Sequence, residues 1–129
     1  MSLSFDRALG VHPYALEVRA DRARILAGNL ANVDTPGYLA RDVDYKTILN
    51  GVARQVARGD ESAAITQGSM ADEMRHPLYR IPYQPSMDGN TAELSVEQSK
   101  FANNATDFQT SLTFLNMKIT GIAKAIEGR

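Results

Sequence analysis

A heptad repeat in the last third of the sequence constrains this 129-residue chain more than any other feature. Apolar residues there follow a strict 4-3 spacing over four heptads, which is typical of a coiled-coil seam. We predict one long helix over residues 95–127, with Ser95 and Gln98 forming a capping box and Gly128 ending the helix. The seam consists of Phe101, Ala105, Phe108, Leu112, Leu115, Ile119, Ile122 and Ile126.

A second helical segment lies near the start of the chain. Leu16, Ala23 and Leu30 recur every seven residues and form its expected share of the coiled-coil seam. Pro13 suits the first turn of a helix, so we expect the helix to begin there after a separate turn. The alternative is a longer helix kinked at Pro13. Because this helix is shorter than the C-terminal one, part of the long seam is expected to stay uncovered in a monomer.

The predicted fold class is therefore mainly α, with the N-terminal helix and the long C-terminal heptad helix pairing as a coiled coil. We expect a short irregular or small-β middle segment, part of it disordered. A short helix is predicted around residues 45–49, and residues 78–83 alternate like an edge strand interrupted by a proline. The domain division is 1–38, 39–93 and 94–129, with both ends forming one assembly domain. The core of a monomeric helical bundle remains the alternative explanation of the heptads.

Composition and charge exclude several classes of function. The formal net charge of −1 supplies no bulk field that would recruit nucleic acid or an anionic membrane. The absence of cysteine excludes a disulfide framework and a thiolate metal site. No window approaches the ~18 apolar residues of a membrane span. The first residues lack a basic region before an apolar run, so we expect no cleavable secretory signal.

The titratable residues form no pattern that indicates catalysis or metal binding. His12 and His76 belong to no metal-ligand spacing and are interpreted as surface or turn residues. We therefore expect no enzyme activity and no cofactor. The remaining charges are interpreted as solvated, or for the arginines as ion pairs to a neighbouring subunit. This set comprises Asp42, Asp44, Asp60, Glu61, Arg19, Arg22 and Arg24.

The segment A-N-V-D-T-P-G-Y (31–38) ends the N-terminal helix in a specified direction. Asn32 can adopt the left-handed cap conformation, and Thr35, which precedes a proline, is disfavoured in the helical region. Pro36 and Gly37 suit the central positions of a type II turn. Tyr38 then begins an extended segment and can pack back on the helix. We predict a rigid exit that places the middle segment beside the helix end.

The longer stretch L-A-G-N-L-A-N-V-D-T-P-G-Y (26–38) resembles the N-terminal signature of the bacterial flagellar axial proteins, the rod and hook family. The resemblance narrows to a proximal rod subunit through A-R-D-V-D-Y (40–45), Y-R-I-P-Y-Q-P-S-M-D-G-N-T (79–91) and K-F-A-N-N-A-T-D-F-Q-T-S-L-T-F-L-N-M-K-I (100–119). Residues 50–77 show no such likeness, and Leu39 stands where a polar residue is common. The assembly turn motif implied by the resemblance is Asn29, Asn32, Thr35, Pro36, Gly37 and Tyr38.

The resemblance implies a structural function in the flagellar basal body. The two helices would form the inner coiled-coil layer of a tubular rod, and the chain would associate with copies of itself and with other rod proteins. Further implied partners are the MS-ring with its rod adaptor and the flagellar type III export apparatus. The competing hypotheses are a secreted type III coiled-coil translocator or adaptor, a small helical enzyme, and another rod or hook subunit.

Overall fold

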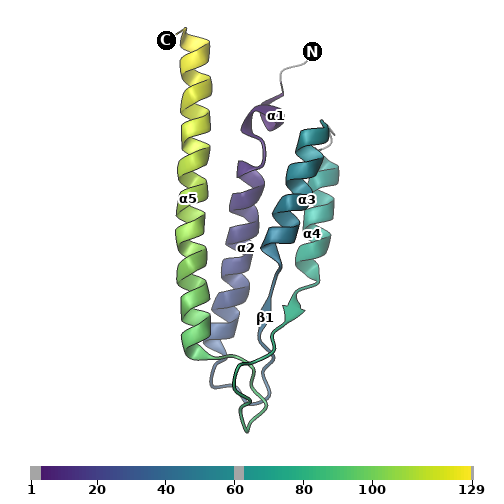
Figure 1. Ribbon diagram of the computed structural model, residues 1–129, viewed down its shortest axis with the longest axis vertical. Coiled ribbons are helices and arrows are strands. Elements are labelled where there is room, and N and C mark those ends of the chain that lie inside the picture. Colours follow the sequence, from purple (N-terminus) through teal and green to yellow (C-terminus); the bar gives the residue numbers. More distant parts are fainter. Residues whose placement is uncertain (1–3, 60–62, 129) are drawn as a thin grey trace.

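The computed structural model describes residues 4–59 and 63–128. Within these ranges the chain is mainly α-helical, which confirms the predicted fold class (Figure 1). The elements, in chain order, are α1 (Phe5–Leu9), α2 (His12–Ala31), β1 (Arg41–Asp42), α3 (Tyr45–Arg58), α4 (Ala63–Arg75), β2 (Leu78–Tyr79) and α5 (Leu94–Glu127).

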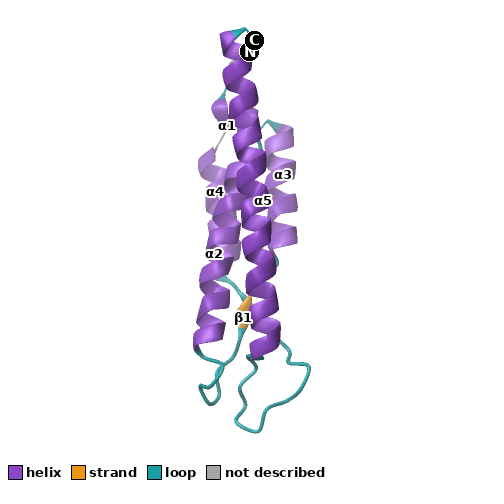
Figure 2. Ribbon diagram, turned by 90° about the vertical axis from the view of Figure 1, so that its left-hand side faces the viewer, coloured by secondary structure: helices purple, strands orange, loops and turns teal. Residues whose placement is uncertain are grey.

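The helices lie roughly parallel to the long axis of an elongated molecule (Figure 1). Helix α2 lies in the middle, with α5 on one side and the α3–α4 pair on the other. The strands and the connecting loops gather at one end, whereas α1 and the last turns of α5 lie at the other (Figures 1 and 2). The two-stranded sheet is antiparallel, with Arg41 opposite Tyr79 and Asp42 opposite Leu78.

Both terminal helices begin and end close to the predicted positions. Helix α2 begins at His12 with Pro13 in its first turn, and Gly10 at a φ of 64° separates it from α1. This confirms the separate turn and excludes the single kinked helix. Helix α5 ends at Gly128, whose left-handed backbone donates its N–H to the carbonyl oxygen of Lys124.

The predicted capping box at the start of α5 is wrong. The helix begins one residue earlier than expected, with Glu93 in the N-cap position and Ser95 already inside the first turn. No side chain caps this end of α5. The carboxylate of Glu93 instead accepts hydrogen bonds from the backbone amides of Tyr83 and Gln84, at 3.1 and 3.3 Å. This carboxylate therefore holds the preceding loop rather than the helix.

The middle segment is more regular than expected. Helix α3 extends through Arg58 instead of stopping near residue 49, and α4 occupies residues 63–75, where no helix was predicted. Asp44 caps α3 by accepting a hydrogen bond from the Thr47 amide. Ile48, Val52 and Val56 share one face of α3 at a spacing of four, but Gly51 interrupts the helical signal in the sequence.

The buried core lies between α2 and the α3–α4 pair. It is formed by Tyr14, Val18, Val43, Ile48, Val52 and Met70. One face of α2 is therefore committed to the middle segment, and a different face packs against α5. Such a division explains why α2 contains buried residues outside its predicted seam.

The predicted seam on α5 is only partly covered. The buried residues of α5 are Glu97, Asn104 and Ser111, which recur every seven residues beside the apolar line. Half of the seam is half-buried, namely Phe108, Leu112, Leu115 and Ile122. The exposed half comprises Phe101, Ala105, Ile119 and Ile126. On α2, the seam residues Leu16, Ala23 and Leu30 are half-buried.

Candidate assembly site

The exit from α2 is shaped by short-range hydrogen bonds. Asn32 directs its side-chain nitrogen back to the carbonyl oxygen of Gly28 at 2.8 Å. Its side-chain oxygen accepts a hydrogen bond from the hydroxyl of Thr35 at 3.0 Å. The backbone of Asn32 has a φ of −114°, so the expected left-handed cap is wrong. Asn32 ends the helix through its side chain, and Gly37 is the residue that adopts the left-handed conformation.

The Pro36–Gly37 pair forms the predicted type II turn. The Tyr38 amide donates to the Thr35 carbonyl oxygen at 3.2 Å, and Gly37 has a φ of 72°. Tyr38 then packs back on α2, as expected, with its hydroxyl 3.2 Å from the side-chain oxygen of Asn29. The turn therefore reverses the chain against the helix that it has just left.

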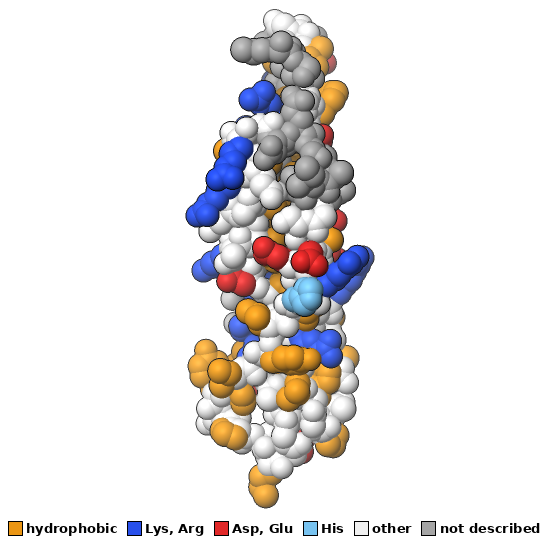
Figure 3. All heavy atoms as spheres, turned by 90° about the vertical axis from the view of Figure 1, so that its right-hand side faces the viewer, with side chains coloured by type: hydrophobic (Ala, Val, Ile, Leu, Met, Phe, Trp, Pro, Cys, Tyr) orange, Lys and Arg blue, Asp and Glu red, His pale blue; other side chains and the backbone are white. Residues whose placement is uncertain are grey.

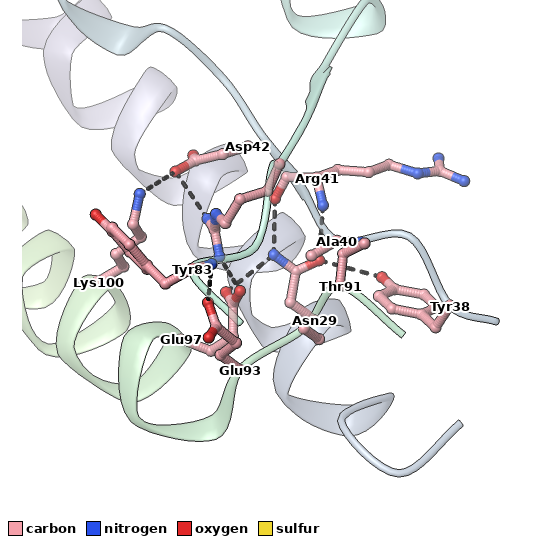
Figure 4. A network of polar contacts seen from close by, with 12 residues as sticks. Asn29, Tyr38, Ala40, Arg41, Asp42, Tyr83, Thr91, Glu93, Glu97 and Lys100 are labelled. Carbon is pink, nitrogen blue, oxygen red and sulfur yellow. Dashed lines mark hydrogen bonds and ion pairs between the residues drawn. The ribbon is translucent and has the colours of Figure 1, made fainter. Parts of the chain in front are cut away.

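The fully buried Asn29 holds strand β1 against α2 (Figure 4). Its side-chain nitrogen donates to the carbonyl oxygen of Arg41 at 2.7 Å, and its side-chain oxygen accepts from the amide of Arg41 at 3.0 Å. The Asn29 side chain thus bonds both the N–H and the C=O of Arg41, as a neighbouring strand would, so these backbone groups of β1 are paired. The same nitrogen also donates to Glu97 on α5 at 3.0 Å. One amide side chain thus joins α2, β1 and α5.

A buried ion-pair network continues from Glu97. The carboxylate of Glu97, fully buried in the first turns of α5, binds the guanidinium group of Arg80. The other terminal nitrogen of Arg80 lies 3.2 Å from a carboxylate oxygen of Asp42. Arg80 follows β2 directly. It therefore links the segment after β2, which we call the arm (residues 78–84), to α5 and to β1.

Asp42 is the centre of this network. The guanidinium group of Arg22 donates to both carboxylate oxygens, at 2.9 and 3.0 Å. The Val43 amide donates at 2.8 Å, and the Lys100 ammonium lies 3.6 Å away. Burial alone would raise the pKa of Asp42, but the hydrogen bonds and charge of Arg22, with help from Val43 and Lys100, lower it. Asp42 is therefore held in its charged form.

The D-G-N-T segment closes over the exit from α2. The fully paired side-chain nitrogen of Asn90 donates to the carbonyl oxygens of Asn32, Val33 and Thr35, at 2.9, 2.8 and 3.0 Å. All three carbonyls follow the end of α2. Those of Asn32 and Thr35 also accept turn hydrogen bonds from the amides of Thr35 and Tyr38, so Asn90 adds a second partner to each. Because Asn90 is only 4% exposed, water cannot readily replace it.

Backbone contacts extend the same pairing. The amide of Gly37 donates to the carbonyl oxygen of Asp88, and the amide of Thr91 donates to the carbonyl oxygen of Tyr38, each at 2.9 Å. Gly89 has a φ of 75°, and a Cβ there would meet the Cα of Gly37 at 3.9 Å. We call the contact of Arg22 and residues 29–42 with residues 78–97 the motif junction. It brings together two segments that lie about fifty positions apart in the chain.

Only part of the motif junction was predictable from the sequence. Asn29, Asn32, Thr35, Pro36, Gly37 and Tyr38 do lie together, whereas the predicted seam residues other than Leu30 run along α2 and α5 away from it. Five further participants were missed: Arg22, Asp42, Arg80, Asn90 and Glu97. Asp42 lies in the motif A-R-D-V-D-Y, and Arg80 and Asn90 lie in Y-R-I-P-Y-Q-P-S-M-D-G-N-T. Their place in these motifs was the signal that could have identified them.

The charge assignments need correction. Asp42 and Arg22 were interpreted as solvated, or Arg22 as a contact to another subunit, but they pair with each other in the interior. Arg19 likewise pairs within the chain, with Asp107 at 2.8 Å. Arg24 is solvated, as interpreted, with its side chain 82% exposed beside Asp21. Asp44 is exposed at the start of α3. Asp60 and Glu61 lie outside the described residues.

The remaining candidate groups lie apart from the motif junction. The ring of His12 is 6.0 Å from that of Phe114, and the ring nitrogen of exposed His76 lies 2.9 Å from the carbonyl oxygen of Asp72. In the part of the chain that the structure describes, acidic and histidine side chains form no group of three suited to a metal ion. Nor does any helix among these residues have the length and apolar character needed to cross a membrane.

The fold and the motif junction together define a class of protein. Paired polar groups lock the two terminal helices to each other at one end, while apolar positions along the helices stay available to other chains. This is the construction of an α-helical assembly subunit.

Comparison with known proteins gives the particular family. No protein-family model matches the chain. It is 42% identical over 132 residues to the flagellar basal body rod protein FlgB of Aeromonas hydrophila, covering 99% of this chain and 98% of the relative. It is 39% identical to FlgB of Salmonella typhimurium over 131 residues, covering 95% of each chain. The Escherichia coli FlgB is 37% identical over 133 residues, covering 95% of this chain and 94% of the relative. The chain belongs to the FlgB family of flagellar basal body rod proteins.

Proposed function

We propose that this protein is a structural subunit of the proximal rod of the flagellar basal body. It polymerises through its terminal helices, helps to transmit torque from the motor and forms part of the export channel wall. The observation that carries this proposal is the incomplete burial of the α5 seam, where Phe101, Ile119 and Ile126 are 38%, 48% and 78% exposed. A line of large apolar residues on a helix is stabilised when another helix covers it.

The motif junction has a supporting role in this function. It fixes where the chain leaves α2 and where it enters α5, so the two helices present their uncovered faces at a constant angle. Arg22, Arg80 and Asp42 make this corner rigid through charged hydrogen bonds in the interior. The assembly turn motif thus acts on assembly through geometry, and it does not have to contact a partner itself.

The partners follow from the position of such a subunit. We infer association with copies of the same chain and with other rod proteins on one side, and with the MS-ring and its rod adaptor on the other. The protein reaches the periplasmic rod unfolded, through the flagellar type III export apparatus. Neither nucleic acid nor insertion into the membrane is part of this function.

A deletion experiment tests the proposal. Cells that lack the gene are expected to be non-motile, and their isolated basal bodies should contain the membrane ring without a rod. A plasmid copy should restore both the rods and motility. Motile cells with intact rods would contradict the proposal and would favour the translocator or adaptor hypothesis, in which the chain is dispensable for the rod.

A further inference from the structure

We propose that an apolar stripe on the arm of one copy docks into the groove between α2 and α5 of a second copy, side by side in the rod. The stripe consists of Tyr79, Ile81 and Tyr83, which we call the arm stripe. This inference rests on the proposed function, because it assigns one contact within the assembly. It names which surfaces of the chain meet, which the proposed function leaves open.

The arm stripe is exposed and apolar along one side of an extended segment. Tyr79, Ile81 and Tyr83 are 62%, 89% and 83% exposed, whereas the side chain of the intervening Arg80 is 9% exposed. Alternation with a period of two is the pattern of a strand with one buried face. Figure 3 shows hydrophobic side chains gathered at the lower end of the face opposite α5. Exposed apolar patches of this kind mark sites of protein association.

The arm stripe is also held rigidly. Arg80 is fixed by Asp42 and Glu97, and its amide donates to the carbonyl oxygen of Ala40 at 2.9 Å. Further along, the Glu93 carboxylate binds the amides of Tyr83 and Gln84. Because the backbone on both sides of Ile81 is fixed before docking, little conformational entropy is lost when a partner covers the stripe. A flexible loop would lack this property.

The groove that we assign to the second copy lies between α2 and α5 and has a volume of about 500 Å³. Small side chains form part of its lining, including Ala20 and Ala23 from α2 and Ala105 from α5. Phe101 and Phe108 also line it. Three members of the predicted α5 seam therefore line this open groove beside α2.

Two polar atoms at the groove lack partners. The Oδ1 atom of Asn104 and the Nε atom of Arg19 are buried without a hydrogen-bond partner in the part of the chain that the structure describes. Both residues line the groove, and Asn104 is only 1% exposed. Leaving such atoms unpaired is costly, about 1–3 kcal/mol each. In the single chain both atoms are covered, so a tyrosine hydroxyl of a second copy can donate to the first and accept from the second only once the lining side chains have shifted. The arm stripe supplies tyrosines together with an apolar side chain.

The dimensions and positions of the two surfaces agree. Tyr83 lies four positions after Tyr79, so the arm stripe spans at most roughly 13 Å. Seven helical residues separate Phe101 from Phe108, a span of roughly 10 Å. Both surfaces lie toward the loop end of the molecule, where the chain runs from β2 through the loops to the start of α5 (Figure 1). A contact between two different surfaces repeats from copy to copy and generates a ring or a helical array.

Cysteine cross-linking tests this contact without background, because the chain contains no cysteine. The test variant carries Ile81→Cys and Ala105→Cys, both at exposed positions. The control carries Ser69→Cys, exposed on α4, together with Ala105→Cys. Basal bodies would be isolated from cells that make each variant and treated with a short bismaleimide. We expect cross-linked multimers of this chain for the test variant and at least tenfold fewer for the control.

Other outcomes would overturn the inference. Rods that contain the test variant but give no multimers would show that the arm stripe does not meet the groove, while the proposed function would stand. Cross-links to a different rod protein would show that this protein, and not a second copy of the chain, meets the arm stripe or the groove. Absence of the wild-type protein from isolated rods would instead contradict the proposed function. As a second variant, Ile81→Asp should reduce the number of rods at least tenfold with unchanged helical content, and normal rod numbers would also overturn the inference.

Discussion

The carboxylate of Glu97 in α5 and the side-chain amide of Asn29 in α2 form a hydrogen bond of 3.0 Å between two fully buried residues. Sixty-eight positions of the chain separate them. Glu97 also binds the guanidinium group of Arg80, so one carboxylate satisfies donors from two other segments. A buried charge of this kind is tolerated because it is paired with the opposite charge of Arg80 and accepts a hydrogen bond from Asn29.

Loss of Glu97 should strongly destabilise the fold. In Glu97→Ala, the guanidinium group of Arg80 and the amide of Asn29 lose a buried partner, and we expect unfolding to become easier by about 3–5 kcal/mol. Urea unfolding followed by circular dichroism measures this change. The neighbouring Gln98 is exposed, so Gln98→Ala should stay within about 0.5 kcal/mol of the wild type. Equal effects of the two substitutions would contradict the role of the buried network.

Asn90 should determine how firmly the loop after α2 is held. Asn90→Asp keeps the shape of the side chain but replaces the donor with an oxygen that faces three carbonyl oxygens. We expect a loss of about 1–3 kcal/mol and faster hydrogen exchange at the Thr35 and Tyr38 amides. The same change at exposed Asn50 in α3 should leave that exchange unaltered. Wild-type protection in Asn90→Asp would show that Asn90 does not hold the loop.

The double substitution Pro36→Ala and Gly37→Ala should abolish assembly. It favours continuation of α2 into the loop and places a Cβ at a φ of 72°, where only glycine is unstrained. We expect the protein to be expressed but rods to be absent, as judged by electron microscopy of isolated basal bodies. The single variant Pro36→Ala keeps Gly37 and should form more rods than the double variant. Normal flagella in the double variant would rule out a role of the turn in assembly.

Stability should fall with acidification because of Asp42. Its pKa is lowered in the folded chain, relative to about 3.9 in an unfolded one. The unfolded state therefore binds the proton more readily, so the contribution of Asp42 is fully present above the unfolded pKa. It is lost as the pH falls through the folded pKa. Urea unfolding at a series of pH values from about 6 to about 3 measures this loss. Asp42→Asn should be less stable at neutral pH and should show a shallower decline, whereas an unchanged slope would contradict this account.

The helical framework was predictable because its signals are local. Each signal depends on residues that are close together in the sequence. Examples are the heptads of α5, the proline in the first turn of α2 and the helix-ending Gly128. The type II turn at Pro36–Gly37 belongs to the same kind of signal. Such features can be recognised in a short stretch of sequence, without information about the rest of the chain.

The buried line of α5 was not predictable in the same way. Apolar periodicity indicates which face of a helix is to be covered, but not by which molecule. Within the chain, α2 covers the polar line of Glu97, Asn104 and Ser111, and the exposed part of the apolar line is left for other chains. The polar line escapes a search for hydrophobic periodicity.

Helix α4 and the motif junction were missed for separate reasons. Gly68 and Ser69 weaken the helical signal of α4, and buried Met70 connects it to the core through a tertiary contact. In the motif junction, the partners come from distant segments, and the pairing of Asp42 with Arg22 depends on their being folded together. A charged side chain in a short sequence window looks solvated whether or not a buried partner exists elsewhere.

The elongated shape has a consequence for directionality. One end of the molecule consists of loops that include Asp34 and Asp88, and the other consists of helix ends near Lys118 and Lys124 (Figure 1). A building block with two unlike ends can be told apart from its own inverted copy. Any structure that incorporates such blocks in a single orientation acquires a distinct beginning and a distinct growing tip, encoded in each subunit without a separate marker.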